Sequence, residues 1–343
     1  MIVLDYANDA TRRDREDAAQ SYVPERCCCT PSTATSHLSH AVPYAAHRIC
    51  AIIMPDAILS VGRVWATVER AGLKIAQARS LAITPADAQA LGPAVPRAIA
   101  SGRSIALEIM GPDAGEVWAG VAAALEARLP PGSLYAATSS AQSAMLLAAF
   151  FGKGMAGRAT QFAPELGASS RLPTGAAPAG ADMPRIESAQ RSTAAMRGSV
   201  TVAVVLPHVV RAGKAGELLS ELIDAACVAS GGLAITALQT FDLDLVTAEE
   251  FYEVYKSVVP EFPDMAAELS AGVCVTVELA GPDAVTSLRK IAGPRDVSIA
   301  QRLRPKSLRA RYGETPARCG VHVTDLVEDG ETESEYFFSI LSE

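Results

Sequence analysis

Histidine is scarce in this 343-residue chain: there are five, and none lies between His47 and His208. The interval between those two residues therefore cannot supply chemistry that depends on histidine. The sequence also lacks an apolar run of the roughly 18 residues that a membrane-spanning helix needs, so we expect no membrane partner. No basic segment followed by an apolar one stands at the start, and no secretory signal is predicted.

The chain has fewer basic than acidic residues: 30 lysines and arginines against 38 aspartates and glutamates, which gives a net charge of −8. Binding to a phosphate backbone needs a basic surface, so nucleic acid is not expected as a partner. The seven cysteines are an odd number and predict free thiols in a reducing, cytoplasmic compartment. Cys27, Cys28 and Cys29 precede His37 and His40, but this spacing fits no zinc pattern, and no metal site is predicted.

What the sequence does contain is a long internal repeat. The motif Gly-Pro-Asp-Ala occupies residues 111–114 and recurs at residues 281–284, each time after a strand-like stretch. Both copies also have an upstream apolar run that ends in proline, at 51–55 in the first and at 203–207 in the second. Each copy closes on a pair of phenylalanines, at 150–151 and at 337–338. The unit is far longer than a solenoid repeat, so we expect two whole domains of one kind.

The sequence divides into four parts. We expect an irregular segment over 1–47, a first repeat over 48–152, a linker rich in Gly, Ala, Pro and Ser over 153–198, and a second repeat over 199–343. The order of elements in each repeat is β-α-β-β-α-β, which is typical of an α+β, ferredoxin-like domain with an antiparallel sheet and helices on one face. Two tandem domains on one chain are expected to pack together as an internal pseudo-dimer.

The element limits follow from periodicity, since apolar spacings of three and four predict helices and short β-branched runs predict strands. The predicted strands are 49–54, 75–83, 104–109, 201–206, 234–241, 274–279 and 320–323. The predicted helices are 61–71, 85–91, 114–125, 141–151, 214–226, 248–255, 262–269, 284–292 and 330–341, with a loop over 293–319. Thr84 followed by Pro85 is a favourable helix start.

The two copies differ in one segment. The closing phenylalanines lie 54 positions after the Ala of the motif in the second copy, but 37 positions after it in the first. The extra stretch carries five basic residues within 302–311 and then His322, so we expect the first copy to have lost its catalytic segment. Arginines bind phosphate oxygens, and a histidine oriented by a carboxylate can act as a nucleophile. The same pattern also fits a basic surface stripe beside a half-buried structural histidine.

Several segments of the second repeat resemble the nucleoside diphosphate kinase family. They are LPHV at 206–209, EFYEVY at 250–255, SLRAR at 307–311, VHVTD at 321–325 and YFF at 336–338. They are most similar to a ciliary branch of the family that has two kinase-like domains in tandem. The resemblance covers the chain from about residue 48 without the linker, and residues 2–9 look like the tail of a small DM10 domain.

The resemblance implies a reaction and a set of site residues. Family members transfer the γ-phosphoryl group of a nucleoside triphosphate, with Mg²⁺, to a nucleoside diphosphate through a phosphohistidine. It implies that His322 is phosphorylated, that Glu333 orients it and that Thr324 contacts it. The phosphate and nucleotide contacts that it implies are Arg289, Arg309, Tyr252 and Phe262.

The departures from the family pattern are as informative. Leu206 and Met54 stand where the family has a phosphate-binding lysine, and Arg295 replaces a phosphate-contacting threonine. Cys319 replaces an asparagine and Val323 a glycine. Phosphoryl transfer depends on positioning and charge, and one charge-assisted contact is worth about 1.5–3 kcal/mol, so losing the lysine predicts at least a ten- to hundredfold loss of activity.

Two functions follow from these expectations. The first is a structural component of the cilium or flagellum axoneme, a cytoskeletal doublet microtubule inner protein that binds tubulin and other inner proteins. The second is a weak nucleoside diphosphate kinase that acts through His322. A third possibility is that the second domain binds nucleotide without turnover. In the first repeat nothing of the site is expected to survive, and Trp118 and Phe151 are predicted core residues.

Overall fold

The computed structural model describes residues 47–155, 199–229 and 232–342. The predicted N-terminal segment with Cys27, Cys28 and Cys29 lies outside the described residues, and so does nearly all of the predicted linker. Within the described ranges, no helix is both long and apolar enough to cross a membrane.

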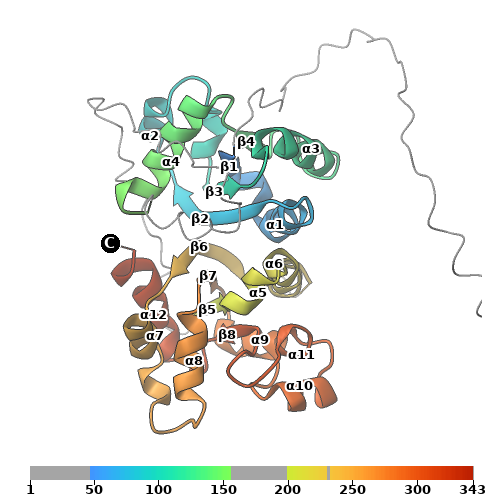
Figure 1. Ribbon diagram of the computed structural model, residues 1–343, viewed down its shortest axis with the longest axis vertical. Helices are drawn as coiled ribbons and strands as arrows, with labels where there is room; N and C mark the ends of the chain where they lie inside the picture. The colour runs from blue at the N-terminus through green and yellow to red at the C-terminus, as the bar shows by residue number, and fades with distance from the viewer. Residues whose placement is uncertain (1–46, 156–198, 230–231, 343) are drawn as a thin grey trace, which may run out of the picture. The chain divides into compact units, whose positions relative to one another are not determined.

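The first half contains the predicted elements in their predicted order, together with one further strand before its last helix (Figure 1). Its strands are β1 (Arg48–Ile53), β2 (Lys74–Ala82), β3 (Arg103–Met110) and β4 (Leu134–Ala136). Its helices are α1 (Val61–Arg70), α2 (Pro85–Ala90), α3 (Ala114–Glu126) and α4 (Ser140–Met155), the last with a kink at Gly152. The predicted helix start is confirmed, because the Thr84 hydroxyl accepts a hydrogen bond from the Asp87 backbone N–H.

The second half has the same order with additional helices. Its strands are β5 (Val200–Val205), β6 (Ala234–Asp242), β7 (Val273–Ala280) and β8 (Val321–Val323). Its helices are α5 (Pro207–Arg211), α6 (Ala215–Ile223), α7 (Leu245–Phe251), α8 (Phe262–Leu269), α9 (Ala284–Ala292), α10 (Val297–Leu303), α11 (Leu308–Tyr312) and α12 (Asp329–Glu335). The loop predicted over 293–319 is wrong, because it contains α10 and α11.

All eight strands of the described ranges belong to one antiparallel sheet with the order β4-β1-β3-β2-β6-β7-β5-β8. The antiparallel sheet predicted from the sequence is therefore present. Each half also contains a β-bulge at the same place, near the start of β2 against β3 and of β6 against β7. Bulges bend a strand at a fixed position, so the matching positions indicate two similar four-stranded units.

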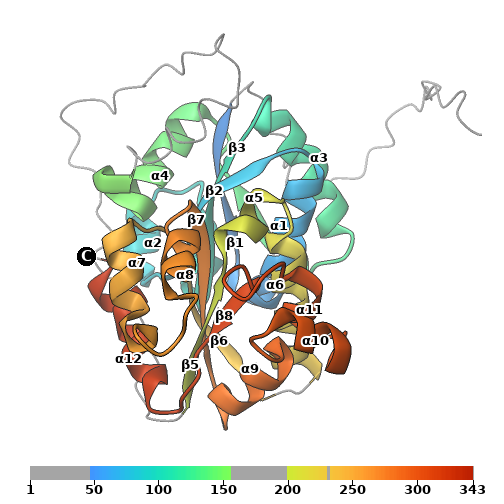
Figure 2. The same ribbon diagram turned by 60° about the horizontal axis from the view of Figure 1, so that its bottom comes forward.

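Helices cover both faces of the sheet, so the predicted single helical face is wrong (Figure 2). On one face a continuous apolar core lies beneath α1, α3, α6 and α9, and Trp118 is fully buried there as predicted. On the other face there are two separate cores, one beneath α2 and α4, which includes Phe151, and one beneath α7, α8 and the C-terminal segment. The second of these cores surrounds the candidate site.

The repeated Gly-Pro-Asp-Ala motif forms the same turn twice. Gly111 and Gly281 have φ of 156° and 157°, values that side chains disfavour, and Asp113 and Asp283 are left-handed at 49° and 48°. Aspartate is one of the few residues with a side chain that tolerates this region, and glycine is needed at the other position. The motif therefore recurs because it starts α3 and α9 with one backbone geometry.

The two halves meet through equivalent residues of β2 and β6, which lie side by side in Figure 1. The Ala78 backbone N–H donates to Thr240 Oγ1 at 3.0 Å, and the Leu238 N–H donates to Ser80 Oγ at 2.9 Å. Ala78 and Leu238 hold the same position in their strands, as do Ser80 and Thr240. Reciprocal contacts of this kind characterise a two-fold interface.

Helices α1 and α6 make a second reciprocal contact across the same junction. A Cβ atom added to Gly62 would overlap the backbone of Ser220, and one added to Gly216 would overlap the backbone of Ala66. Each glycine thus faces the residue four positions after the other glycine. The Gly216 N–H also donates to the Glu69 carboxylate at 3.1 Å, which joins the two halves by a polar contact.

Candidate active site

His322 lies in the middle of β8, where it pairs with Val204 of β5. The side chain is buried, and its ring packs edge-on against Phe251 at 5.1 Å and Tyr252 at 5.7 Å between centroids. Both aromatic residues come from the end of α7. The short strand and these two rings therefore fix the orientation of the imidazole.

Glu333 on α12 holds one nitrogen of that imidazole. Its carboxylate oxygens lie 3.3 and 3.2 Å from His322 Nε2, and the second also accepts a hydrogen bond from Thr324 Oγ1 at 2.8 Å. Thr324 in turn accepts from the Val202 backbone N–H at 3.0 Å. A carboxylate only accepts, so Nε2 carries the proton. Nδ1 keeps a lone pair and has no hydrogen-bond partner among the residues that the structure describes.

The structure brings together the three residues expected to form the catalytic group, with one change of role. Thr324 bonds to Glu333, and no contact between its hydroxyl and the His322 ring is found in the described part of the chain. The hydroxyl therefore orients the carboxylate, and the carboxylate orients the ring. An imidazole with Nε2 fixed and Nδ1 free is suited to nucleophilic attack through Nδ1.

The two predicted phosphate-binding arginines lie in different surroundings. Arg309 is buried and lines the cavity beside His322, where its Nε donates to the Val321 carbonyl and its Nη1 to the Gly293 carbonyl, both at 3.1 Å. Arg289 is half exposed, and its Nε lies 4.0 Å from Asp325 Oδ1. Arg289 is not among the cavity-lining residues, so of the two only Arg309 faces His322.

The predicted nucleotide contacts are also divided. Tyr252 lines the cavity, and burial raises the pKa of its hydroxyl well above the usual value, so the hydroxyl stays protonated. Phe262 does not line the cavity. It begins α8 and packs at the edge of the core beneath that helix. The role of Phe262 as a base-stacking residue stays a prediction.

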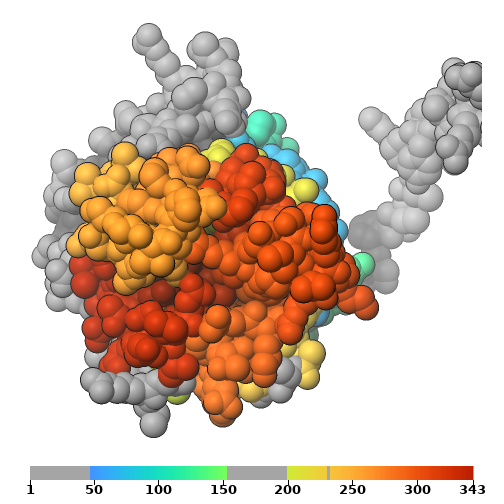
Figure 3. Space-filling model, turned by 90° about the horizontal axis from the view of Figure 1, so that it is seen from below, coloured from blue at the N-terminus to red at the C-terminus, as the bar shows by residue number. Residues whose placement is uncertain are grey.

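The cavity beside His322 is very small, at about 10 Å³. That is room for about one water molecule, whereas sites for small ligands usually measure about 300–1,000 Å³. Figure 3 shows the face of the molecule that the orange and red segments of the second half form. The cavity as it stands therefore holds no group much larger than a water molecule.

The lining residues that sequence reasoning missed include Tyr255, Asp325 and Met265. The Tyr255 hydroxyl donates to Asp325 Oδ2 at 2.6 Å, and burial together with this bond raises the pKa of Tyr255. The Arg295 guanidinium lies 4.9 Å above the Tyr255 ring and also contacts the Met265 sulfur. The positions of Tyr255 and Asp325, three residues after Tyr252 and His322, are the only local signal that could have marked them.

The position expected to hold a lysine provides no charge to the cavity. Leu206 is buried in the core next to β5, and Met54 is buried at the equivalent place in the first half. Cys319 lines the cavity, and its thiol donates to the Val321 carbonyl at 3.4 Å. The departures at Leu206 and Cys319 therefore remove a lysine and an amide from a site whose histidine and carboxylate are retained.

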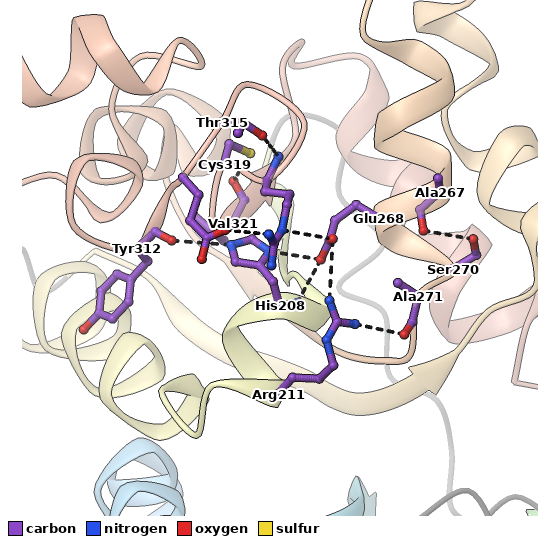
Figure 4. A network of polar contacts seen from close by, with 12 residues as sticks. His208, Arg211, Ala267, Glu268, Ser270, Ala271, Tyr312, Thr315, Cys319 and Val321 are labelled. Atoms are coloured by element: carbon purple, nitrogen blue, oxygen red, sulfur yellow. Dashed lines mark hydrogen bonds and ion pairs between the residues drawn. The ribbon is translucent and has the colours of Figure 1, made fainter.

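A second polar network surrounds the Glu268 carboxylate on α8 (Figure 4). It accepts from the His208 backbone N–H at 2.8 Å and lies 3.0 Å from His208 Nδ1, with Arg211 at 3.7 Å and Arg318 at 3.3 Å. Burial alone would raise the pKa of Glu268, but the bonds from His208 and the charge of Arg211 hold it below its usual value. Glu268 thereby ties α8 to α5 and to the segment that precedes Cys319.

The first half contains a strand, β4, in the segment that the sequence of the first copy was expected to have lost. β4 pairs with β1, and Tyr135 sits opposite Ile52 as His322 sits opposite Val204. The Gln142 side-chain amide donates to the Tyr135 hydroxyl at 2.7 Å. The expected loss of the whole catalytic segment is therefore wrong. The strand persists with tyrosine in place of histidine, and the part that the first half lacks is the helical stretch with α10 and α11.

Within the described ranges, no three His, Cys, Asp or Glu residues lie close enough together to hold a metal ion. Of the residues in these ranges, Asp325 is the one carboxylate that lines the cavity. The residues present therefore do not form a Mg²⁺ site of their own, and a Mg²⁺ ion would have to arrive with nucleotide phosphates.

Comparison with known proteins confirms the family resemblance. A model of the family described as "Nucleoside diphosphate kinase" matches residues 199–341. "Nucleoside diphosphate kinase homolog 7" of Rattus norvegicus is 43% identical over 141 residues, which are 41% of this chain and 34% of the relative. The nucleoside diphosphate kinase of Aquifex aeolicus (strain VF5) is 31% identical over 139 residues, 40% of this chain and 93% of the relative.

A solved structure of a nucleoside diphosphate kinase from Aquifex aeolicus, an orthorhombic crystal form, has 30% sequence identity and a TM-score of 0.38. It covers 42% of this chain and 97% of its own. The chain spans about a third of the length of the homolog 7 relatives that it matches. The family match accounts for the ferredoxin-like fold and antiparallel sheet of the second half.

Proposed function

Since the chain belongs to the nucleoside diphosphate kinase family, we propose that it uses the fold of that family chiefly as a structural building block. The observation that carries this proposal is the cavity beside His322, which at about 10 Å³ is too small to enclose a phosphate group of a nucleotide. The absence of a lysine at Leu206 supports it, because phosphoryl transfer depends on charge at the phosphates. The resemblance of the second repeat to a ciliary branch of the family directs the proposal to cilia.

The proposed location is the axoneme of a cilium or flagellum, where the chain would be a doublet microtubule inner protein. Its proposed partners are tubulin and neighbouring inner proteins. In this proposal residues 48–152 are a second, degenerate kinase-like domain in tandem with residues 199–343. The equal strand order, the matching bulges and the repeated turn support a common origin of the two.

Fractionation of isolated axonemes tests the structural proposal. After detergent removes the membrane, the protein should stay with the doublets through extraction in high salt, as a protein enclosed in the lattice would. An abundant soluble protein from the same cells serves as the control for trapping. Release of all of the protein with the detergent-soluble fraction would contradict an axonemal location.

A second candidate function is weak nucleoside diphosphate kinase activity. The observation that favours it is the intact group of His322, Glu333 and Thr324 with a free Nδ1. In the reaction, the Nδ1 lone pair forms a bond to the γ-phosphorus while the bond from that phosphorus to its bridging oxygen breaks. The electron pair leaves with the nucleoside diphosphate, and Glu333 stabilises the charge on the ring. A second diphosphate reverses these steps.

Formation of a phosphohistidine tests this second function. Incubation of the whole chain with γ-labelled ATP should give a label that is stable to base and labile to acid, and His322→Ala should abolish it. His47→Ala is a matched control, because His47 is exposed and remote in sequence from β8. Absence of label on the unaltered chain would leave the structural proposal standing alone.

A further inference from the structure

Two cationic side chains line the cavity beside His322. They are Arg295 and Arg309, and among the described residues Asp325 is the one acidic side chain that lines it. Asp325 is already engaged by the Tyr255 hydroxyl and lies near Arg289. Two guanidinium groups around so small a space repel each other, and an anion between them would relieve that repulsion.

The two arginines of the cavity are held in different ways. Arg309 is fixed by two charge-assisted hydrogen bonds to backbone carbonyls. Arg295 rests on the face of the Tyr255 ring and on the Met265 sulfur, and it forms no ion pair with any residue in the described ranges. A cation–π contact is weaker than a bidentate ion pair between a guanidinium and a phosphate. A phosphate group would therefore compete well for the Arg295 guanidinium.

The backbone that carries Arg295 is anchored although the side chain is not. The Gly293 carbonyl accepts the bond from Arg309 Nη1 at 3.1 Å. Gly293 has φ of 84°, and a Cβ there would overlap the Ser307 side chain, so this turn is specific to glycine. Arg309 thus fixes the turn two residues before Arg295. The Arg295 side chain can therefore leave the Tyr255 ring without a change in the backbone that carries it.

We propose that Arg295 is a phosphate-binding residue, which leaves the Tyr255 ring and binds the terminal phosphate of a di- or triphosphate placed at His322 Nδ1. Its guanidinium supplies the positive charge that is absent at Leu206, and its departure enlarges the cavity. The guanidinium stays protonated while the phosphorus passes to Nδ1. This inference rests on the second function proposed above.

Inorganic pyrophosphate is a suitable probe, because it has the phosphates of the substrate but no base or sugar. Binding to the whole chain is measured by calorimetry, and labelling by γ-labelled ATP is measured in parallel. Arg295→Lys keeps the charge and Arg295→Met keeps much of the length without it. Arg304→Met is the control, since Arg304 is exposed and contacts the Lys290 carbonyl away from the cavity.

The expected result is that Arg295→Met weakens pyrophosphate binding about 10- to 100-fold, as the loss of a charge-assisted contact would. Arg295→Lys should retain most of the affinity, and Arg304→Met should retain all of it. Equal or tighter binding by Arg295→Met would overturn the proposal and would mean that Arg295 merely fills the cavity. No binding by the unaltered chain would overturn it as well.

The parallel labelling separates this proposal from the kinase proposal. Pyrophosphate binding that depends on Arg295, with no phosphohistidine, would support the phosphate-binding role and contradict the kinase activity. A phosphohistidine that forms equally fast in Arg295→Met would support the kinase activity and contradict the role of Arg295.

Discussion

Tyr135 on β4 and His322 on β8 occupy the same place in the two halves of this molecule. Each lies at the centre of a three-residue edge strand, Tyr135 opposite Ile52 and His322 opposite Val204. The hydroxyl of Tyr135 is bonded to the amide of Gln142, whereas His322 is bonded to the carboxylate of Glu333. One edge strand thus supports a neutral pair in the first half and an ionisable pair in the second.

A histidine placed at Tyr135 in the first half should not form a phosphohistidine. In Tyr135→His with His322→Ala, we expect no acid-labile phosphate above the level of His322→Ala alone. The reason is that Gln142 is not a carboxylate and that the first half lacks the arginine-bearing segment of 302–311. Labelling with γ-labelled ATP measures this. A label that appears only with Tyr135→His would show that the strand position alone is sufficient.

The contact between α1 and α6 predicts a large difference between two glycines. Gly216→Ala should destabilise the chain by about 1–3 kcal/mol, because the new methyl group overlaps the Ala66 backbone and the helices must separate. Gly120→Ala is the control. Gly120 lies inside α3, and a methyl group there would extend into open space, so the better helix propensity of alanine should add up to about 1 kcal/mol.

Denaturation in urea at one pH, followed by circular dichroism, measures both effects. Equal stability of the two alanine variants would mean that α1 and α6 are not in backbone contact. A loss confined to Gly216→Ala would support the reciprocal junction between the two halves.

Much of this architecture follows from the sequence, and the misses have physical reasons. The apolar runs and the repeated motif identify seven strands, because buried β-branched residues and positive φ values leave clear patterns. β4 is three residues long and follows Pro130 and Pro131, so no periodicity marks it. The helices α10 and α11 are short and rich in arginine, and their composition resembles a loop.

The site shows the same division. His322, Glu333 and Thr324 were identified because they lie close together in the sequence and match a family motif. The contact between Glu268 and His208 joins residues 60 positions apart, and no local pattern predicts it. Arg295 was recognised as a departure from the family, but only its place beside Tyr255 shows that it reaches the cavity.

Glu268 should be important for stability, because it is buried and serves three partners. We expect Glu268→Gln to lower the free energy of unfolding by about 3 kcal/mol at pH 7. This is the low end for breaking a buried ion pair, since Arg211 and Arg318 are half exposed and water screens them. Urea denaturation measures it, and exposed Glu249→Gln on α7 is the control. Equal stability of the two variants would contradict the network.

The pKa of Glu268 adds a dependence on pH. Because the folded chain holds this pKa below the usual value of 4.5, the unfolded chain takes up the proton first as the pH falls. The stability that Glu268 contributes should therefore be present above about pH 4.5 and be lost below it. The difference between the unaltered chain and Glu268→Gln should shrink as the solution is acidified from pH 5 to pH 3.

Glu69, at the junction of the two halves, should show the opposite dependence. Burial raises the pKa of Glu69 from 4.5 to about 7, although the hydrogen bond from the Gly216 N–H acts to lower it. Between these two values the folded chain holds a proton that the unfolded chain has released, so stability should fall as the pH rises from about 4.5 to about 7. Glu69→Gln stays neutral and should remove this part of the slope.

Urea denaturation at pH 5, 6, 7 and 8 measures the effect as the difference between the unaltered chain and Glu69→Gln. Exposed Glu116→Gln on α3 should leave the slope unchanged. The gain from Glu69→Gln should grow with pH and level off above about pH 7, because the carboxylate of the unaltered chain is then fully charged at the junction. A constant difference across this range would mean that Glu69 is already ionised in the folded chain at pH 5.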